Sequence, residues 1–361
     1  MKLGIVGPTI PYKGGVAQHT TELAFRMRAA GHEVQLASWK AQYPGRLYPG
    51  QLEVSGGEGV PFPETRRSLT WYSPLSWYRE ARRLRDRDLL LLCLVNVFQI
   101  PAYLVIARTV RAGGTRVAVL CHNVVPHDAS FWQLSLIRSL FATVPLALVH
   151  SRDEADAAER LGAKSVSVAA LPFFLPAKVC PVASFEEPTR RILFFGFVRP
   201  YKGLDLLIDA IDQASTQVSL RVVGEFWQPV EFFGDQVARL GLVGRVDLED
   251  RYLRSEEVPA LFEGIDALVV PYRSATGSQH PRLGHLCGVP VIVTDVGDLP
   301  SQVIHGVDGL VCAAGDAAAI ASAIDNLYRP GVLESMRRRI REEPPVDDWP
   351  NYVAALENLN Y

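Results

Sequence analysis

The sequence predicts an α/β protein with two doubly wound, parallel-sheet domains. Short apolar runs rich in Val, Ile and Leu alternate with segments of helical periodicity, and this alternation occurs in both halves of the chain. Strand, helix and strand in that order form a parallel sheet covered by helices. The 361 residues leave room for two domains, and a composition with 48% hydrophobic and 21% charged residues is typical of a globular protein.

The first series of elements occupies the N-terminal half. Apolar runs predict strands at residues 3–6, 33–38, 89–94, 116–121 and 146–150. Helical spacing predicts helices at residues 16–30, 102–112 and 153–161. Residues 89–107 also have the length of a membrane span, but Asn96, Gln99 and Pro101 interrupt them. A buried strand, a polar loop and a helix from Pro101 therefore fit this stretch better.

A second series follows a proline-rich, aperiodic stretch at residues 172–188, which has the composition of a linker. It predicts strands at residues 191–196, 218–223, 246–248, 267–270 and 289–294, and helices at residues 204–215, 235–240 and 255–263. A last helical segment covers residues 349–359. We expect an N-terminal domain at 1–171, a C-terminal domain at 172–345, and a helix within 346–361 that packs back on the first domain.

The cysteines and the N-terminus favour a reducing compartment. The five cysteines are scattered, odd in number and without a CxxC pair, so neither disulfides nor a zinc site is expected. The apolar run at residues 1–7 is too short for a signal peptide. We therefore expect a cytoplasmic protein with buried thiols.

Charge is unevenly distributed along the chain. Residues 1–172 carry 20 Lys and Arg against 13 Asp and Glu, a net +7, whereas the remainder carries 17 against 26, a net −9. Seven arginines between Arg66 and Arg87 are interleaved with Trp71, Tyr72, Trp77 and Tyr78. Such a segment suits an anionic membrane surface, or else a solvated helix whose aromatic residues face the core. No recognised nucleic-acid-binding module accompanies it, so nucleic acid is not expected as a partner.

Two strand ends in the second half have the composition of anion sites. One strand ends at Gly196 and is followed by the cations Arg199 and Lys202. Another ends in a loop of small and hydroxylated residues, Ser274, Ala275, Thr276, Gly277 and Ser278. Free backbone N–H groups and cations at strand ends hold phosphate. Two such ends in one domain suggest a diphosphate ligand.

Taken together, these segments resemble the GT-B-fold retaining glycosyltransferases of family 4 over nearly the whole chain. The matching pieces are the glycine loop at 13–19 (KGGVAQH), the G-x-x-x-x-x-KG segment at 196–203, and the G-x-P-V-I-x-x-x-x-G-x-x-P run at 288–300. The resemblance implies two Rossmann-like domains that face each other across a cleft. It also implies an enzyme that transfers the sugar of a nucleoside diphosphate sugar to a hydroxyl acceptor.

The resemblance assigns roles to individual residues. Arg199 and Lys202 would stabilise the departing diphosphate, and His122, in the segment 119–128, would face the transferred sugar. Contacts to the donor are expected from these positions: Gly14, Gly15, Gly196, Gly224, Glu225, Tyr252, Leu253, Ser274, Ala275, Thr276, Gly277 and Ser278.

The chain also departs from the family pattern. Alignment on Gly288 puts Ala275 and Leu283 where many members have two glutamates eight residues apart. A subset of the family has a serine- and threonine-rich loop instead, and the present loop matches that form. We expect hydroxyl and N–H groups to bind the phosphate there, and the resemblance leaves the ribose contact unassigned.

No metal or other cofactor is expected. His280 and His285 lie near the predicted phosphate loop but lack a third ligand at suitable spacing, and Asp247–Asp250 only faintly imitates an Asp-x-Asp motif. The expected partners are a nucleotide-sugar donor, a hydroxyl acceptor and an anionic membrane surface on the inner face of the plasma membrane. Two alternatives stay open, a GT-B-fold sugar-nucleotide epimerase and a non-catalytic sugar-nucleotide-binding protein. An epimerase would need carboxylates for proton transfer, and the loss of both glutamates argues against it.

Overall fold

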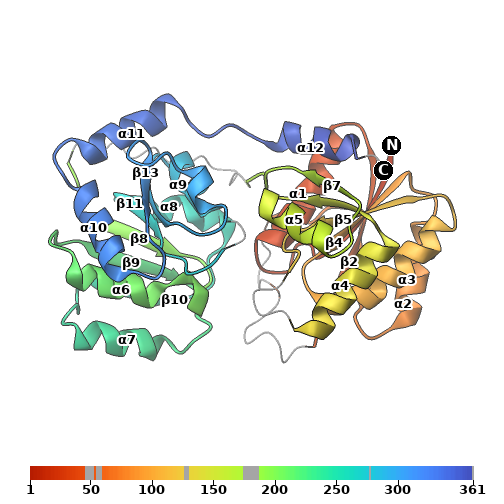
Figure 1. The fold of residues 1–361 in the computed structure, drawn as a ribbon, viewed down its shortest axis with the longest axis horizontal. Helices are drawn as coiled ribbons and strands as arrows, with labels where there is room; N and C mark the ends of the chain where they lie inside the picture. The colour runs from red at the N-terminus through yellow and green to blue at the C-terminus, as the bar shows by residue number, and fades with distance from the viewer. Residues whose placement is uncertain (45–52, 54–58, 126–129, 174–186, 276–277, 360–361) are drawn as a thin grey trace. The chain divides into compact units, whose positions relative to one another are not determined.

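The computed structural model describes residues 1–44, 53, 59–125, 130–173, 187–275 and 278–359. The chain forms two compact units, one made of Met1–Phe174 with Asp347–Tyr361 and the other of Leu175–Val346. Each unit is built on a parallel sheet with helices packed on it (Figure 1). The predicted fold class, two Rossmann-like α/β domains, is confirmed.

The first unit contains a seven-stranded parallel sheet with the order β3-β2-β1-β4-β5-β6-β7. Its central strand β4 (Leu89–Leu94) is buried along its whole length, as expected for a strand covered on both faces. The other strands are β1 Lys2–Val6, β2 Glu33–Ala41, β3 Thr65–Thr70, β5 Arg116–Cys121, β6 Leu146–Val149 and β7 Ser165–Val168. Its helices are α1 Gly15–Ala29, α2 Pro74–Arg83, α3 Ile100–Arg111, α4 Phe131–Thr143, α5 Arg152–Arg160 and α12 Trp349–Glu357.

The apolar stretch 89–107 divides into β4, a 3₁₀ turn at Val97–Gln99 and the start of α3. Polar side chains cause the break: Asn96 accepts a hydrogen bond from the backbone N–H of Phe98, and Gln99 accepts one from the N–H of Val95. Within the described ranges, no helix has the length and apolar character needed to cross a membrane.

The C-terminal helix α12 packs on the first unit. Trp349 and Tyr352 are buried, and the indole N–H of Trp349 donates to the carbonyl of Phe173 at 3.2 Å. Leu356 and Leu359 complete an apolar cluster that includes β1 and α1 side chains. α12 and Leu359 thus cover one face of the first sheet.

The second unit contains a six-stranded parallel sheet with the order β10-β9-β8-β11-β12-β13. Its strands are β8 Arg191–Phe195, β9 Ser219–Gly224, β10 Val246–Asp250, β11 Ala267–Val270, β12 Val291–Thr294 and β13 Gly309–Cys312. Its helices are α6 Leu204–Gln213, α7 Val230–Arg239, α8 Val258–Leu261, α9 His280–Leu286, α10 Ala317–Leu327 and α11 Val332–Glu342. Phe195 pairs with Val223, so β8 and β9 end side by side.

The cysteines only partly follow the expectation. Cys93, Cys121 and Cys312 are free, and burial raises the pKa of the Cys93 thiol to about 12. Cys287, by contrast, is disulfide-bonded, which corrects the expectation of thiols throughout. Spacing along the sequence could not reveal this pairing, because it does not report distance in the fold.

Candidate functional site

The carboxyl ends of β8 and β9 meet at two glycines that no other residue could replace without strain. Gly196 has φ +100°, and a Cβ there would lie 3.0 Å from Nε2 of His280 and 3.5 Å from Nζ of Lys202. A Cβ on Gly224 would lie 1.8 Å from the carbonyl oxygen of Gly196. The missing side chains therefore leave room for a lysine amine and an imidazole beside the strand end.

Lys202 is a buried cation without a counter-ion among the described residues. It ends the 3₁₀ turn Pro200–Lys202 just before α6, and its Nζ lies 5.2 Å from the centre of the Tyr272 ring. Burial, reinforced by the positive charge of Arg199, lowers the pKa of Lys202 to about 7. A buried ammonium without a carboxylate partner is costly, so the arrangement favours an anionic ligand.

Arg199 stands beside Lys202 and is held by aromatic rings. Its guanidinium carbon lies 3.7 Å from the centre of the Trp227 ring and 5.6 Å from that of Phe197. Its Nε is buried and has no hydrogen-bond partner in the described part of the chain. Stacking fixes the guanidinium plane while leaving its N–H groups available, which suits recognition of phosphate oxygens.

The second loop predicted from the sequence is anchored to the first. The backbone N–H of Arg273 donates to the carbonyl of Tyr201 at 2.7 Å, and its guanidinium donates to Pro200 O at 2.9 Å and to Asp205 at 2.8 Å. Half-buried Ser274 and Ala275 follow at once. Two strand ends far apart in sequence are thereby brought together, as predicted. Thr276 and Gly277 lie outside the described residues.

Gly297 packs closely against the backbone of this loop at Ala275. It has φ +53°, and a Cβ there would lie 2.0 Å from the carbonyl oxygen of Ala275. The glycine in the 288–300 run therefore allows close contact with the loop.

His280 belongs to the same constellation, although the sequence reasoning considered it only as a metal ligand. Its Nε2 lies 3.1 Å from the carbonyl oxygen of Phe195, and its Nδ1 lies 2.8 Å from Oγ of Ser278. Burial, together with the charge of Lys202, lowers the pKa of His280 to about 3. The imidazole is therefore neutral near pH 7 and joins the two strand ends. The only feature of the sequence that could have indicated this role is the position of His280 directly after the hydroxylated loop.

The other predicted donor residues of this unit lie along the neighbouring edge. The carbonyl of Glu225 accepts a hydrogen bond from the N–H of Val198 at 2.9 Å. The Tyr252 ring lies 6.1 Å from that of Phe197, and Leu253 packs against the apolar cluster beneath β8 and β11. Glu225 and Tyr252 therefore border the segment that carries Arg199.

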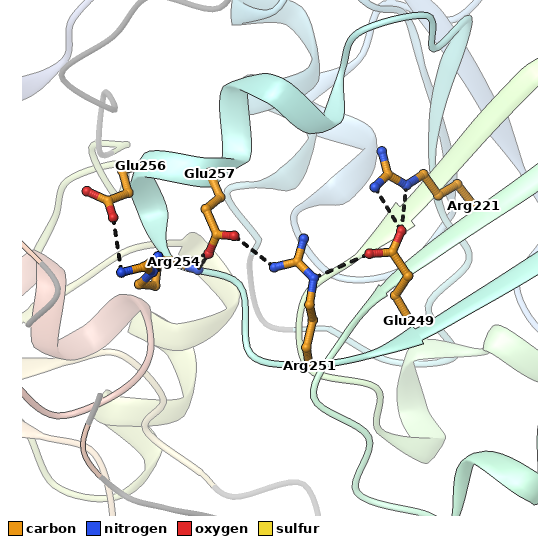
Figure 2. A network of polar contacts seen from close by, with 6 residues as sticks. All are labelled: Arg221, Glu249, Arg251, Arg254, Glu256 and Glu257. Atoms are coloured by element: carbon orange, nitrogen blue, oxygen red, sulfur yellow. Dashed lines mark hydrogen bonds and ion pairs between the residues drawn. The ribbon is translucent and has the colours of Figure 1, made fainter. Parts of the chain in front are cut away.

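A network of ion pairs holds the segment that contains Tyr252 and Leu253 (Figure 2). Arg251 reaches Glu249 at 3.3 Å and Glu257 at 2.9 Å, and Arg221 reaches Glu249 at 2.8 Å. Arg254 continues the network to Glu257 at 3.4 Å. Glu249, part of the faint acidic motif, is thus neutralised by two arginines. Within the described ranges, no three His, Cys, Asp or Glu side chains are placed to hold a metal ion.

The remaining candidates belong to the first unit. Gly14 has φ +97° and precedes α1, whereas a Cβ on Gly15 would meet open space. His122 follows β5, and its backbone N–H reaches the carbonyl of Leu94 at 3.5 Å. The conformation of Gly14 needs glycine, and the position of His122 is set by the end of β4.

His122 is part of a cluster of histidines that the sequence did not predict. Its ring centre lies 4.9 Å from that of His19 and 5.0 Å from that of His150. The Nε2 atoms of all three rings are buried and have no hydrogen-bond partner among the described residues. Burial, with the neighbouring imidazole charge of His150, lowers the pKa of His122 well below its usual value. His122 is therefore a neutral imidazole at pH 7.

Known protein families match both units. A model described as "Glycosyl transferase 4-like domain" matches residues 14–173, and one described as "Glycosyl transferases group 1" matches residues 189–329. Among curated proteins, D-rhamnosyltransferase WbpZ of Pseudomonas aeruginosa is 34% identical over 41% of this chain and 39% of its own. Phosphatidyl-myo-inositol mannosyltransferase of Mycobacterium leprae is 26% identical over 92% of this chain and 89% of its own.

The matches to an uncharacterized glycosyltransferase of Methanocaldococcus jannaschii and to WbpZ span only 32% and 39% of those relatives. Among solved structures, Anabaena HepE in complex with UDP has a TM-score of 0.72 at 17% identity, with 99% of each chain covered. A glycosyltransferase from Rickettsia africae has a TM-score of 0.71 at 12% identity, again with 99% of each chain covered. By its two matching domains and its fold, the chain belongs to the GT4-like glycosyltransferases of GT-B fold.

Proposed function

We propose that the protein transfers a hexose from a nucleoside diphosphate sugar to a hydroxyl acceptor, with retention of anomeric configuration. The observation that carries this proposal is Lys202, a buried ammonium without a described counter-ion, next to Arg199 and the glycine strand ends. HepE has been crystallised with UDP and with UDP-glucose, which supports a nucleotide sugar as donor.

The chemistry follows from charge development on the leaving group. As the bond between the anomeric carbon and the phosphate oxygen breaks, negative charge grows on the diphosphate, and Lys202 and Arg199 stabilise it. The acceptor oxygen bonds to the same carbon, and its proton passes to the departing phosphate. His122 donates to or accepts from a sugar hydroxyl as a neutral imidazole. The sequence suggests no nucleophile for the opposite face, so we favour attack from the leaving-group side.

A panel of nucleotides and nucleotide sugars tests this proposal. We expect thermal stabilisation by nucleoside diphosphates, and release of nucleoside diphosphate from one donor on incubation with the protein. Turnover is expected to survive a chelator, because the described residues offer no metal cluster. Binding without release would instead favour a non-catalytic sugar-nucleotide-binding protein. Activity lost with chelator and restored by magnesium or manganese would contradict the metal-free site.

We also propose that the first unit contacts an anionic membrane, where a lipid-borne acceptor would be found. The structure changes which residues of the segment 66–87 can support this proposal. Four of the seven arginines form ion pairs within the protein: Arg66 and Arg83 with Glu80, Arg67 with Glu53, and Arg87 with Glu33. Trp77 is buried, so part of the segment is core after all.

The residues of this segment that remain exposed form a surface of aromatic and basic side chains. Leu75, Tyr78, Arg79 and Arg82 lie on the outward face of α2. Arg79, Arg82 and Arg85 form no ion pair within the described ranges. A row of ring contacts from Tyr72 through Trp71 and Phe98 reaches Trp132 on α4. Exposed rings beside unpaired cations fit the headgroup region of an anionic bilayer.

The start of α4 extends this surface beyond the segment predicted from the sequence. Phe131 is 91% exposed and Trp132 is 52% exposed. Tyr72, Tyr78, Phe131 and Trp132 are four of the five strongly exposed aromatic side chains among the described residues; the fifth is Phe232 of the second unit. We call the first four residues, with Leu75, Arg79 and Arg82, the aromatic surface.

A further inference from the structure

His280 connects two parts of the diphosphate site that come from distant segments. Its Nε2 reaches the last residue of β8, Phe195, and its Nδ1 reaches Ser278 at the end of the hydroxylated loop. The Phe195 and His280 rings are 4.6 Å apart, and the imidazole is half-buried. His280 therefore bridges the strand that leads to Lys202 and the loop that faces it.

The hydrogen-bond partners determine the tautomer of His280. A carbonyl oxygen only accepts, so the proton of the neutral ring is on Nε2, which donates to Phe195. Nδ1 is then an acceptor, and the hydroxyl of Ser278 donates to it at 2.8 Å. The same hydroxyl oxygen accepts from the backbone N–H of His280 at 3.2 Å. The Tyr272 hydroxyl also lies near Nδ1, at 3.4 Å. Ser278 is the closer donor, so its one hydroxyl proton is directed to the imidazole rather than to a ligand.

This geometry alters the role predicted for Ser278. The sequence led us to expect a hydroxyl donor to phosphate, but here the side chain anchors the loop. Lys202 and His280 both lie over Gly196, since a Cβ there would approach Nζ of Lys202 at 3.5 Å and Nε2 of His280 at 3.0 Å. A displaced His280 would therefore disturb the place of the Lys202 ammonium as well as the loop.

We propose that His280 is a positioning residue of the diphosphate site: through Ser278 and Phe195 it fixes the loop after β11 against the end of β8, where Lys202 lies. This inference rests on the proposed function. It assigns no contact with the sugar or the nucleotide to His280, which acts through Ser278 and by confining Lys202. Its loss leaves the cations and the Arg273 contacts present but frees Ser278, at the end of the loop, from the end of β8.

Calorimetry with UDP and with inorganic pyrophosphate tests the proposal. His280→Ala and Ser278→Ala are each expected to weaken binding about tenfold, the effect of one hydrogen bond to a charged or buried group. The double variant is expected to be no weaker than either single one, because both remove the same link. His280→Asn keeps an acceptor for Ser278 and His280→Gln keeps a donor for Phe195, so each should restore part of the affinity.

His285 on the same helix provides the matched control. Its Nε2 lies 3.1 Å from the carbonyl of Asp308, away from Lys202, so His285→Gln should bind both ligands as the wild type does. Binding by His280→Ala within twofold of wild type would overturn the proposal. So would equal losses in His285→Gln, or additive losses in the double variant. If His280→Ala does not fold, the affinities of His280→Asn and Ser278→Ala still test the proposal. If the wild type binds neither ligand, the proposed function itself fails.

Discussion

Lys202 places its amine in a buried part of the second unit. Burial and the charge of Arg199 lower its pKa to about 7, while His280 beside it stays neutral and Tyr272 offers only the face of its ring. A diphosphate would stabilise the ammonium form and so raise this pKa. Ligand binding and protonation of Lys202 are therefore expected to be coupled.

This coupling predicts proton uptake when a nucleoside diphosphate binds. Above pH 7 the free site is partly neutral, so binding draws in up to one proton and the affinity falls as pH rises from 7 to 9. Near pH 5.5 the amine is already charged and uptake disappears. Calorimetry of UDP binding in buffers with different ionisation enthalpies measures the proton number. If proton uptake persists unchanged in Lys202→Met, a group other than Lys202 takes up the proton.

His122 is expected to act on turnover rather than on nucleotide affinity, because it belongs to the first unit and not to the unit that holds Lys202. His122→Ala should lower kcat strongly while the Kd for UDP stays close to that of wild type. Steady-state kinetics and calorimetry on one preparation separate the two quantities. A variant with normal kcat would return His122 to a structural role in the histidine cluster.

At the level of single residues, the sequence predicted the groups whose position follows from a strand end. Gly196, Arg199, Lys202 and Ala275 do lie along adjoining strand ends, because β8, β9 and β11 run in parallel. It did not predict the role proposed for His280, which depends on two hydrogen bonds, one to the end of β8 and one to the loop after β11. Nor did it predict the histidine cluster, whose members are far apart along the chain.

The histidine cluster connects several elements of the first unit: it joins α1 and the ends of β5 and β6 to α12. His19 stacks on Trp349 at 5.3 Å, and His150 stacks on Tyr352 at 5.8 Å. Burial lowers the pKa of His150 to about 4 and that of His19 well below its usual value. Protonation of these rings is therefore unfavourable while α12 is packed on them.

Acid should therefore destabilise the first unit. Because the folded-state pKa values lie below the unfolded value near 6.5, the unfolded chain takes up protons first as pH falls. The free energy of unfolding is fully retained above about pH 6.5 and declines toward pH 4, by roughly 1 to 3 kcal/mol for His150. Urea unfolding at pH 7.5 and pH 5, followed by Trp fluorescence, checks this. His150→Gln should reduce the difference, and a wild type equally stable at both pH values would contradict it.

The aromatic surface on α2 and α4 predicts selective binding to anionic vesicles. Exposed rings insert among headgroups, and each arginine near an anionic surface contributes about 1 kcal/mol, reduced by salt. Phe131→Ser combined with Trp132→Ser should sharply reduce sedimentation with phosphatidylcholine–phosphatidylglycerol vesicles at low salt. Phe232→Ser, which removes the exposed ring of the second unit, is the control and should have no effect. Equal, negligible binding of wild type to neutral and anionic vesicles would favour an acceptor in solution.

Elements with apolar runs were predictable, and those without them were not. The continuous apolar runs of β4 and β5 predict buried strands. β3, by contrast, carries two arginines in six residues and has no apolar run. It pairs with β2 at the edge of the sheet, where one side needs no neighbour. α4 also escaped prediction, because its buried side chains are few and its first residues, Phe131 and Trp132, are exposed.

For the molecule as a whole, each unit carries a different part of the proposed reaction. The first holds His122 and the aromatic surface, and the second holds Lys202, Arg199 and the loop fixed by His280. Repetition of the strand–helix pattern was enough to predict two parallel sheets. The pattern could not predict which cations remain without a partner, because that depends on side-chain contacts such as those that neutralise four of the arginines near α2.

Calorimetric titration of UDP into wild type, Lys202→Met and Arg199→Ala, with Arg339→Ala as the control, tests the central claim most directly. Arg339 is an arginine of α11 in the same unit, ion-paired with Glu343. We predict that wild type and Arg339→Ala bind alike, and that each variant of the site loses roughly 1.5 to 3 kcal/mol of binding free energy, the range for hydrogen bonds to charged groups. Unchanged affinity in both Lys202→Met and Arg199→Ala would contradict the assignment of a diphosphate to this site.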